Sequence, residues 1–140
     1  MAVPSGPVAP STEAECALFD LVDAYDRAYE AAASSQLLSG AQACVLGRLT
    51  APRGMGALAD ELGCDASNIT QIVARLERRG LVIREPDPAD RRGRVITRTL
   101  AGDELNERFE EAFDFGRDAV QRLSRSEQDQ LTALLRKALG

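Results

Sequence analysis

Hydroxyl, amide and guanidinium side chains share the faces of a predicted helix between residues 66 and 79. Its apolar residues Ile69, Val73 and Leu76 recur at helical spacing and predict one buried stripe. The polar residues away from this stripe are Ser67, Asn68, Thr70, Gln71, Arg75 and Arg78. Amide groups can pair with adenine, and guanidinium groups with guanine or phosphate, so this face is a candidate DNA-contacting surface.

A second group of arginines follows shortly after this helix. Residues 81–85 and 95–99 are two β-favouring runs, and the proline, aspartate and glycine residues between them predict an antiparallel ribbon with a long charged tip over 86–94. The tip carries Arg91, Arg92 and Arg94, which could enter a narrow minor groove or bind phosphates. We expect Asp90 to pair with a neighbouring arginine and hold the loop in shape.

Other chemistry is poorly represented in this chain. There is no histidine, so the usual general base is missing, and we expect the protein not to be an enzyme. Cys16, Cys44 and Cys64 are widely spaced and include no CxxC pair, which favours free thiols and predicts neither a metal site nor a cofactor. No apolar run approaches the roughly 20 residues of a membrane span, and the N-terminus lacks signal-peptide features. We therefore expect a cytoplasmic protein.

Charge is distributed unevenly along the 140 residues. The net charge is −5, yet residues 48–98 contain ten arginines and seven acidic residues, a local balance of +3. The rest of the chain therefore carries −8. A basic middle between acidic ends would let one face approach phosphates despite the overall sign.

The elements expected around these residues form a mainly α chain of the α+β class. Capping boxes at Thr12, Ser39 and Ser124 predict three helix starts, and Asp65 should cap the helix over 66–79. The remaining predicted helices cover 55–62, which ends at Gly63, and 100–123. A helix pair followed by a ribbon is a winged helix-turn-helix arrangement.

The expected organisation has three parts. Residues 1–11 predict a disordered arm, and 37–99 the winged helix-turn-helix region. Residues 12–36 and 100–140 predict helices that mediate dimerisation. All six aromatic residues lie in these terminal segments, which suggests a packing unit separate from the middle and an interface for a homodimer.

The sequence resembles the MarR family of bacterial regulators. The motifs that carry the resemblance run in order along most of the chain: Leu38-Ser39-x-x-Gln42, Leu58-Ala59-x-x-Leu62, Ser67-x-Ile69-Thr70, Leu76-Glu77-x-x-Gly80-Leu81-Val82-x-Arg84, Asp87-Pro88-x-Asp90-Arg91-Arg92 and Thr99-x-x-Gly102. The resemblance implies a homodimer that represses transcription from a palindromic operator in double-stranded DNA. It also implies release by a small effector, often aromatic or acidic. Arg98 and Ala57 depart from the family pattern, away from the proposed DNA surface.

Several alternatives remain open from sequence alone. Cys16 lies early in the first helix, as does the reactive thiol of peroxide-sensing relatives, but Gly40-Ala41-Gln42-Ala43 lacks the tyrosine that accompanies it there. Tyr25 and Tyr29 could line an effector pocket or simply pack in the core or interface. The polar helix face and the charged turn could be solvated surface, in which case a winged-helix protein-interaction module without DNA binding is the alternative.

Overall fold

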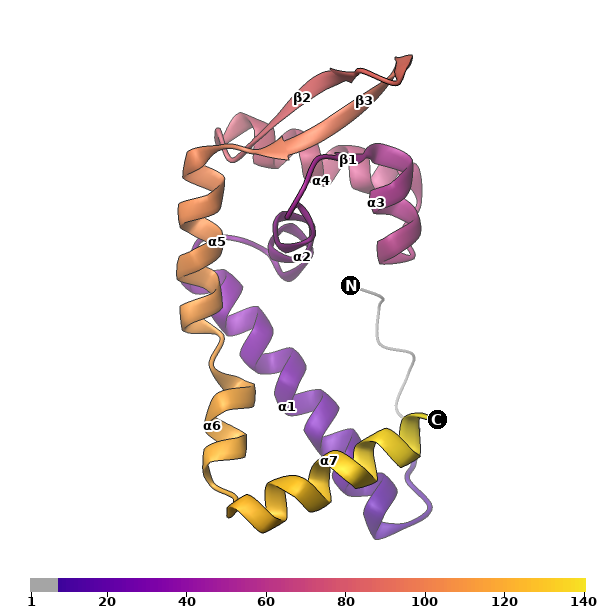
Figure 1. Ribbon diagram of the computed structural model, residues 1–140, viewed down its shortest axis with the longest axis vertical. Coiled ribbons are helices and arrows are strands. Elements are labelled where there is room, and N and C mark those ends of the chain that lie inside the picture. Colours follow the sequence, from indigo (N-terminus) through magenta and orange to yellow (C-terminus); the bar gives the residue numbers. More distant parts are fainter. Residues whose placement is uncertain (1–7) are drawn as a thin grey trace.

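The computed structural model describes residues 8–140, which form seven helices and a small sheet at one end of the molecule (Figure 1). Residues 1–7 of the predicted arm lie outside this range. The bounds of the elements are α1 Glu13–Ser35, α2 Gly40–Arg48, β1 Arg53–Gly54, α3 Met55–Leu62, α4 Ala66–Arg78, β2 Val82–Asp87, β3 Asp90–Arg98, α5 Leu100–Ala112, α6 Phe115–Gln121 and α7 Arg125–Leu139. No helix in this part of the chain is long and apolar enough to cross a membrane.

Side-chain caps fix where most of the helices begin. Thr12, Ser39 and Ser124 each accept a hydrogen bond from the backbone N–H of the third helical residue. The predicted capping box is complete at Ser39 and Ser124, whereas at Thr12 the Glu15 carboxylate accepts from Ser11 instead of Thr12. α3 ends at Gly63, whose φ of 62° lies in the left-handed region. Asp65 does precede α4, but its side chain makes no capping hydrogen bond, so the predicted cap is wrong in its chemistry.

The sheet has three strands in the order β1-β3-β2, and both pairings are antiparallel. The sequence predicts β2 and β3 but not β1, in which Arg53 and Gly54 pair with Ile96 and Val95. Two residues are too few to carry an alternating pattern, and the flanking proline and glycine indicate only a break. β1 anchors the start of α3 to the central strand.

The predicted single helix over 100–123 is two helices, because the chain turns at Phe113 and Asp114. The Phe113 ring packs against Tyr25 and Tyr29 of α1. Arg117 donates hydrogen bonds to the carbonyl oxygens of Glu110 and Glu111, which satisfies acceptors at the end of α5. Aromatic packing and this arginine cap therefore accompany a helix break that no glycine or proline marks in the sequence.

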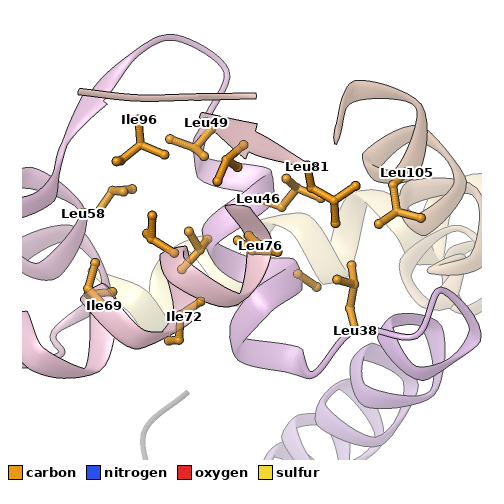
Figure 2. Close-up of a cluster of buried hydrophobic side chains, with 14 of the residues drawn as sticks. Leu38, Leu46, Leu49, Leu58, Ile69, Ile72, Leu76, Leu81, Ile96 and Leu105 are labelled. Atoms are coloured by element: carbon orange, nitrogen blue, oxygen red, sulfur yellow. The ribbon is translucent and has the colours of Figure 1, made fainter. Parts of the chain in front are cut away.

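The hydrophobic core lies between α2, α3, α4 and the sheet (Figure 2). Its fully buried side chains come from every one of these helices and from β2 and β3: Val45, Leu46, Leu58, Ile69, Val73, Leu76, Val82 and Ile96. The cluster continues into the terminal helices through Ala32 and Ala33 of α1 and through Leu105 and Phe109 of α5. The expectation of two separate packing units is therefore wrong, because one buried cluster joins them.

The corner between α4 and β2 touches the start of α5 without intervening side chains. Thr99 donates from its backbone N–H to the Leu81 carbonyl at 3.0 Å and from its hydroxyl to the Gly80 carbonyl at 2.6 Å. A Cβ on Gly102 would lie 2.1 Å from the Leu81 carbonyl oxygen, which explains why glycine stands there. Backbone-to-backbone contact thus fixes α5 to the corner.

We predict that Gly102→Ala lowers the free energy of unfolding by about 1–3 kcal/mol, because the added methyl group forces α5 away from a backbone carbonyl. Gly56→Ala is the matched control, since nothing lies within 4 Å of the position that its methyl group would take in α3. It should leave stability unchanged or raise it by up to about 1 kcal/mol. Urea denaturation of both variants measures the difference, and equal midpoints would contradict the steric argument.

Candidate nucleic-acid interface

α4 presents a polar face to solvent and an apolar stripe to the core. Ile69, Val73 and Leu76 are fully buried, and Ile72, which the predicted stripe does not include, is only 8% exposed. The predicted contact residues are all exposed: Ser67, Asn68, Thr70, Gln71, Arg75 and Arg78. The four buried residues hold the helix firmly, so its outer face can meet a ligand as a rigid surface.

The exposed residues of α4 do not all occupy the same position around the helix. Ser67, Gln71 and Arg78 follow one another at helical spacing directly opposite the buried stripe. Asn68 and Arg75 lie on one side of this line, and Thr70 lies on the other. The Thr70 hydroxyl donates to the Ala66 carbonyl at 2.8 Å, so its proton is already used within the helix. Along the outer face, Gln71 is the middle side chain, between Ser67 and Arg78.

The ribbon is longer, and its tip shorter, than the sequence predicts. Regular pairing of β2 with β3 extends to Pro86 and Arg94, and Asp87 then pairs with Asp90 across Pro88 and Ala89. The register shift at this point leaves 91–93 without partners on β2. Proline, aspartate and glycine therefore form a tight turn and an irregular strand here, in place of the loop expected over 86–94. Arg91, Arg92 and Arg94 are all exposed on β3.

Aspartates shape the end of the ribbon through backbone contacts. Asp90 accepts a hydrogen bond from the backbone N–H of Arg92 at 3.0 Å, and Asp87 accepts one from Ala89 at 2.8 Å. Side-chain acceptors of this kind stabilise tight turns. The Asp90 carboxylate thus contacts the backbone of Arg92 and not an arginine side chain. Within residues 8–140 it forms no ion pair with a guanidinium group. The arginine side chains remain available.

Internal contacts divide the ten arginines of 48–98 into two groups. Arg53 pairs with Glu61, Arg84 with Glu77 at 3.5 Å, and Arg98 with Asp103 at 2.9 Å. Arg79 donates to the Leu37 carbonyl at 2.6 Å. In the part of the chain that the structure describes, no acidic side chain pairs with the other six, which are all exposed: Arg48, Arg75, Arg78, Arg91, Arg92 and Arg94. Five of these six belong to the predicted DNA surface, and Arg48 is the one that sequence reasoning did not single out.

Arg98 has a structural position that the sequence did not reveal. Its side chain is largely buried, and its Nη1 donates to the Leu46 carbonyl at 3.3 Å near the end of α2. Its Nε lies near Asp103 without pointing at the oxygen, so that contact is an ion pair rather than a hydrogen bond. An arginine at this strand position therefore links β3 to α2 and α5.

The two tyrosines lie in an aromatic cluster between α1 and the α5–α6 segment. Tyr25 packs edge-on against Phe113 and Phe115 with ring centroids 5.1 and 5.9 Å away. Tyr29 packs edge-on against Phe109 and Phe113 at 5.0 and 5.2 Å. Burial raises the pKa of the Tyr29 phenol, with a further contribution from the neighbouring Cys44 thiol, so the hydroxyl stays protonated. Both rings are held mainly by packing.

An open cavity of about 320 Å³ lies elsewhere, at the end of α5, and is lined by Glu107, Glu110, Glu111 and Arg117. Neither tyrosine lines it. Its three carboxylates would disfavour an acidic ligand. The candidate effector residues and this cavity are therefore two different places in the fold.

The three cysteines are free thiols at separate positions. Cys44 and Cys64 are half-buried, and Cys64 packs against the hydrophobic core. Cys16 is exposed near the start of α1, between Glu13 and Glu15 on one side and Asp20 on the other in sequence. Exposure meets one requirement of a reactive thiol.

Comparison with known proteins gives one consistent answer. The model of the MarR family matches residues 38–93, which run from the start of α2 through the ribbon tip. The HTH-type transcriptional regulator YkoM of Bacillus subtilis is 35% identical over 89 residues, which are 62% of this chain and 57% of that protein. The chain spans about half the length of the curated relatives that it matches.

Solved structures share the whole architecture. A mutant of MepR from S. aureus is 26% identical, with a TM-score of 0.79 over 91% of this chain and 96% of that one. A mutant of MarR from E. coli, complexed with operator DNA, is 27% identical, with a TM-score of 0.70 over 88% and 91%. These matches confirm the predicted mainly α, winged helix-turn-helix fold. Over residues 38–93 the chain matches the MarR family model, and its fold is that of the MepR and MarR structures.

Proposed function

We propose that this chain is a transcriptional repressor that binds a palindromic operator in double-stranded DNA as a homodimer. The observation that carries the proposal is the placement of five exposed arginines, without acidic partners among residues 8–140, on α4 and on the β2–β3 ribbon, the wing. Uncompensated guanidinium groups on two projecting elements suit a polyanion. A DNA ligand would also place the protein in the cytoplasm, and it requires no catalytic group.

The two elements suit different grooves. α4 is a rigid helix whose outer face is centred on Gln71, and the major groove admits a helix of this kind. The wing is a thin ribbon that ends in Arg91 and Arg92, a shape that suits the minor groove or the phosphates beside it. The E. coli MarR mutant of the same fold has been solved with operator DNA, which supports this mode of binding.

The terminal helices favour a dimer. No residue of α7 is buried in the single chain, and Leu134 and Leu139 are 65% and 88% exposed. Leu18, Leu21 and Val22 of α1 are exposed as well. A 15-residue helix without a buried face is marginal in water, so a second copy that covers these leucines would explain why α7 forms. A dimer would also present two α4 helices, as a palindrome requires.

The proposal includes release from DNA by a small aromatic or acidic effector, as the family resemblance implies. Tyr25 and Tyr29 would contact such a molecule, because their rings form part of an aromatic surface between α1 and α5. Entry of a ligand would require these rings to part from Phe109 and Phe113. The acidic cavity near Arg117 is the less suitable place for an acidic effector.

Gln71→Ala tests base recognition. We expect it to cost about 1–3 kcal/mol on a duplex selected by the wild-type protein from a random pool, and to relax sequence preference at one position of each half-site. Thr70→Val, which removes a hydroxyl already bonded within α4, is the control and should cost less. Fluorescence anisotropy on the selected duplex and its point variants measures both effects. Equal losses for the two variants would contradict the central position of Gln71.

Arg91→Gln and Arg92→Gln test the wing. Each should weaken binding to all duplexes and reduce the slope of log K against log salt by about 1, because one fewer phosphate contact releases one fewer counterion. Arg125→Gln, an exposed arginine at the start of α7, should leave the slope unchanged. A salt titration with random-sequence duplex measures these slopes. It also tests the alternative of a protein-interaction module, which predicts no salt-dependent DNA binding by the wild type.

Leu134→Glu tests the dimer. A carboxylate in a covered apolar surface is strongly unfavourable, so the variant should sediment as a monomer and bind the selected duplex at least about tenfold more weakly. Ultracentrifugation of the wild-type and variant proteins measures the oligomeric state. Ala101→Glu, at an exposed position at the start of α5, is the control for the added charge. A dimeric Leu134→Glu variant would exclude this face from the interface.

Peroxide sensing through Cys16 is the second candidate, and the exposure of this thiol is the one observation that favours it. The comparison is DNA binding by the parent and by Cys16→Ser, each with and without peroxide. Loss of binding in the parent alone would support the sensor.

A further inference from the structure

The turn that ends α1 has a backbone shape that normally requires glycine. The N–H of Leu38 bonds to the Ala33 carbonyl, and the N–H of Leu37 bonds to the Ser34 carbonyl, which is the Schellman pattern of a helix end. The residue at its left-handed position is Leu37, with a φ of 57°. A leucine pays a steric penalty in this region, because its Cβ approaches the following carbonyl.

Packing does not offset this penalty. The Leu37 side chain is 82% exposed, so it contributes almost nothing to the core. The neighbouring Leu38 is buried, and the turn must form for Leu38 to reach its place. Contacts to the turn backbone therefore have to hold the strained conformation.

Arg79, the residue that ends α4, makes those contacts. Its Nη1 donates to the Leu37 carbonyl at 2.6 Å, and its Nη2 donates to the Gln36 carbonyl at 3.4 Å. Two adjacent carbonyls at a helix end thus share one guanidinium group. Such carbonyls lack partners in the helix and carry the negative end of its dipole, so a cation is favourable there.

Two further contacts hold the same turn. Arg108 of α5 donates from Nε to the Gln36 side-chain oxygen at 3.2 Å. Glu30 of α1 accepts a hydrogen bond from the backbone N–H of Gly40 at 3.1 Å, at the start of α2. The turn is therefore connected to α1, α2, α4 and α5, and Arg79 provides its contact with the predicted recognition helix.

We propose that Arg79 is a positioning residue for DNA binding, which holds the strained Leu37 turn and so fixes the orientation of α4 relative to α1. Its guanidinium group is engaged with the turn and not with phosphate. Arg78, next to it in sequence, donates to the Ala74 carbonyl of its own helix and is exposed on the outer face of α4. The predicted effect of Arg79 on DNA affinity rests on the proposed function. The contact of Arg79 with the Leu37 turn is independent of that function.

Arg79→Gln and Arg78→Gln remove the same charge from adjacent residues and make a matched pair. We expect Arg79→Gln to weaken binding to the selected duplex about three- to tenfold, because fewer molecules hold α4 in the competent orientation. Its salt slope should match that of the wild type. Arg78→Gln should reduce the slope by about 1, as the loss of a phosphate contact does. A reduced slope or unchanged affinity for Arg79→Gln would overturn the proposal.

A rescue experiment distinguishes positioning from a direct contact. Glycine adopts the left-handed conformation without a steric penalty, so Leu37→Gly should let the turn form without help from Arg79. We expect Leu37→Gly to recover most of the affinity that Arg79→Gln loses and to have little effect in the wild-type background. Additive effects of the two substitutions would overturn the proposal. Urea denaturation shows that each variant is folded at the assay temperature.

Hydrogen exchange tests the contact without DNA. Amide protons of Leu37 and Leu38 should exchange faster in Arg79→Gln than in the wild type, and Arg78→Gln should leave them unchanged. Equal exchange in all three proteins would overturn the proposal whether or not the chain binds DNA. Failure of the wild type to bind any duplex would instead refute the proposed function, and faster exchange in Arg79→Gln would still show that Arg79 holds the turn.

Discussion

A direct backbone contact between the α4–β2 corner and the start of α5 sets the angles at which three elements of this fold meet. Leu81 accepts from the Thr99 N–H, and Gly102 leaves no room for a side chain against the Leu81 carbonyl. In the same corner, Gly80 follows the end of α4, and its φ of 72° turns the chain into β2. α4, β2 and α5 therefore meet at this corner at fixed angles. This corner therefore sets how α4, the wing and the start of the C-terminal helices lie relative to one another.

The charge on the surface of the molecule depends on which arginines have partners inside the fold. Arg53, Arg84 and Arg98 pair with acidic residues nearby in the sequence. Arg79 and Arg98 also donate to carbonyls of residues far away in the sequence, Leu37 and Leu46. The remaining arginines of 48–98 project from α4, the wing and the end of α2. A net charge of −5 is thus compatible with a basic surface, because the acidic residues are concentrated at the two ends of the chain. Charge position, rather than total charge, decides what this surface can bind.

Sequence reasoning identifies the elements that local chemistry specifies. Capping boxes locate α1, α2 and α7, and apolar periodicity locates α4, because each pattern lies within a few neighbouring residues. Features that depend on residues far away in the sequence are not predicted. β1 exists only against β3, and the break at Phe113 depends on the α1 tyrosines. Arg79 and Arg98 look like surface residues in the sequence, and their roles emerge only when Leu37 and Leu46 are brought beside them.

Communication between the terminal helices and the DNA-facing elements has few routes in this fold. Among residues 8–140, polar contacts reach α4 and the wing from the α1 side through the turn at Leu37, and from the α5 side through Thr99 and the Arg98–Asp103 ion pair. Gly102 adds a close backbone approach on the α5 side. On the α5 side, the backbone of α5 packs directly against the α4–β2 corner, and such close packing leaves little room for the two to move relative to each other. The α1 route includes a strained leucine held by an exposed arginine, so a displacement of α1 would act directly on that contact. An effector or a partner copy that moved α1 would therefore reach α4 more easily through Arg79 than through the α5 corner.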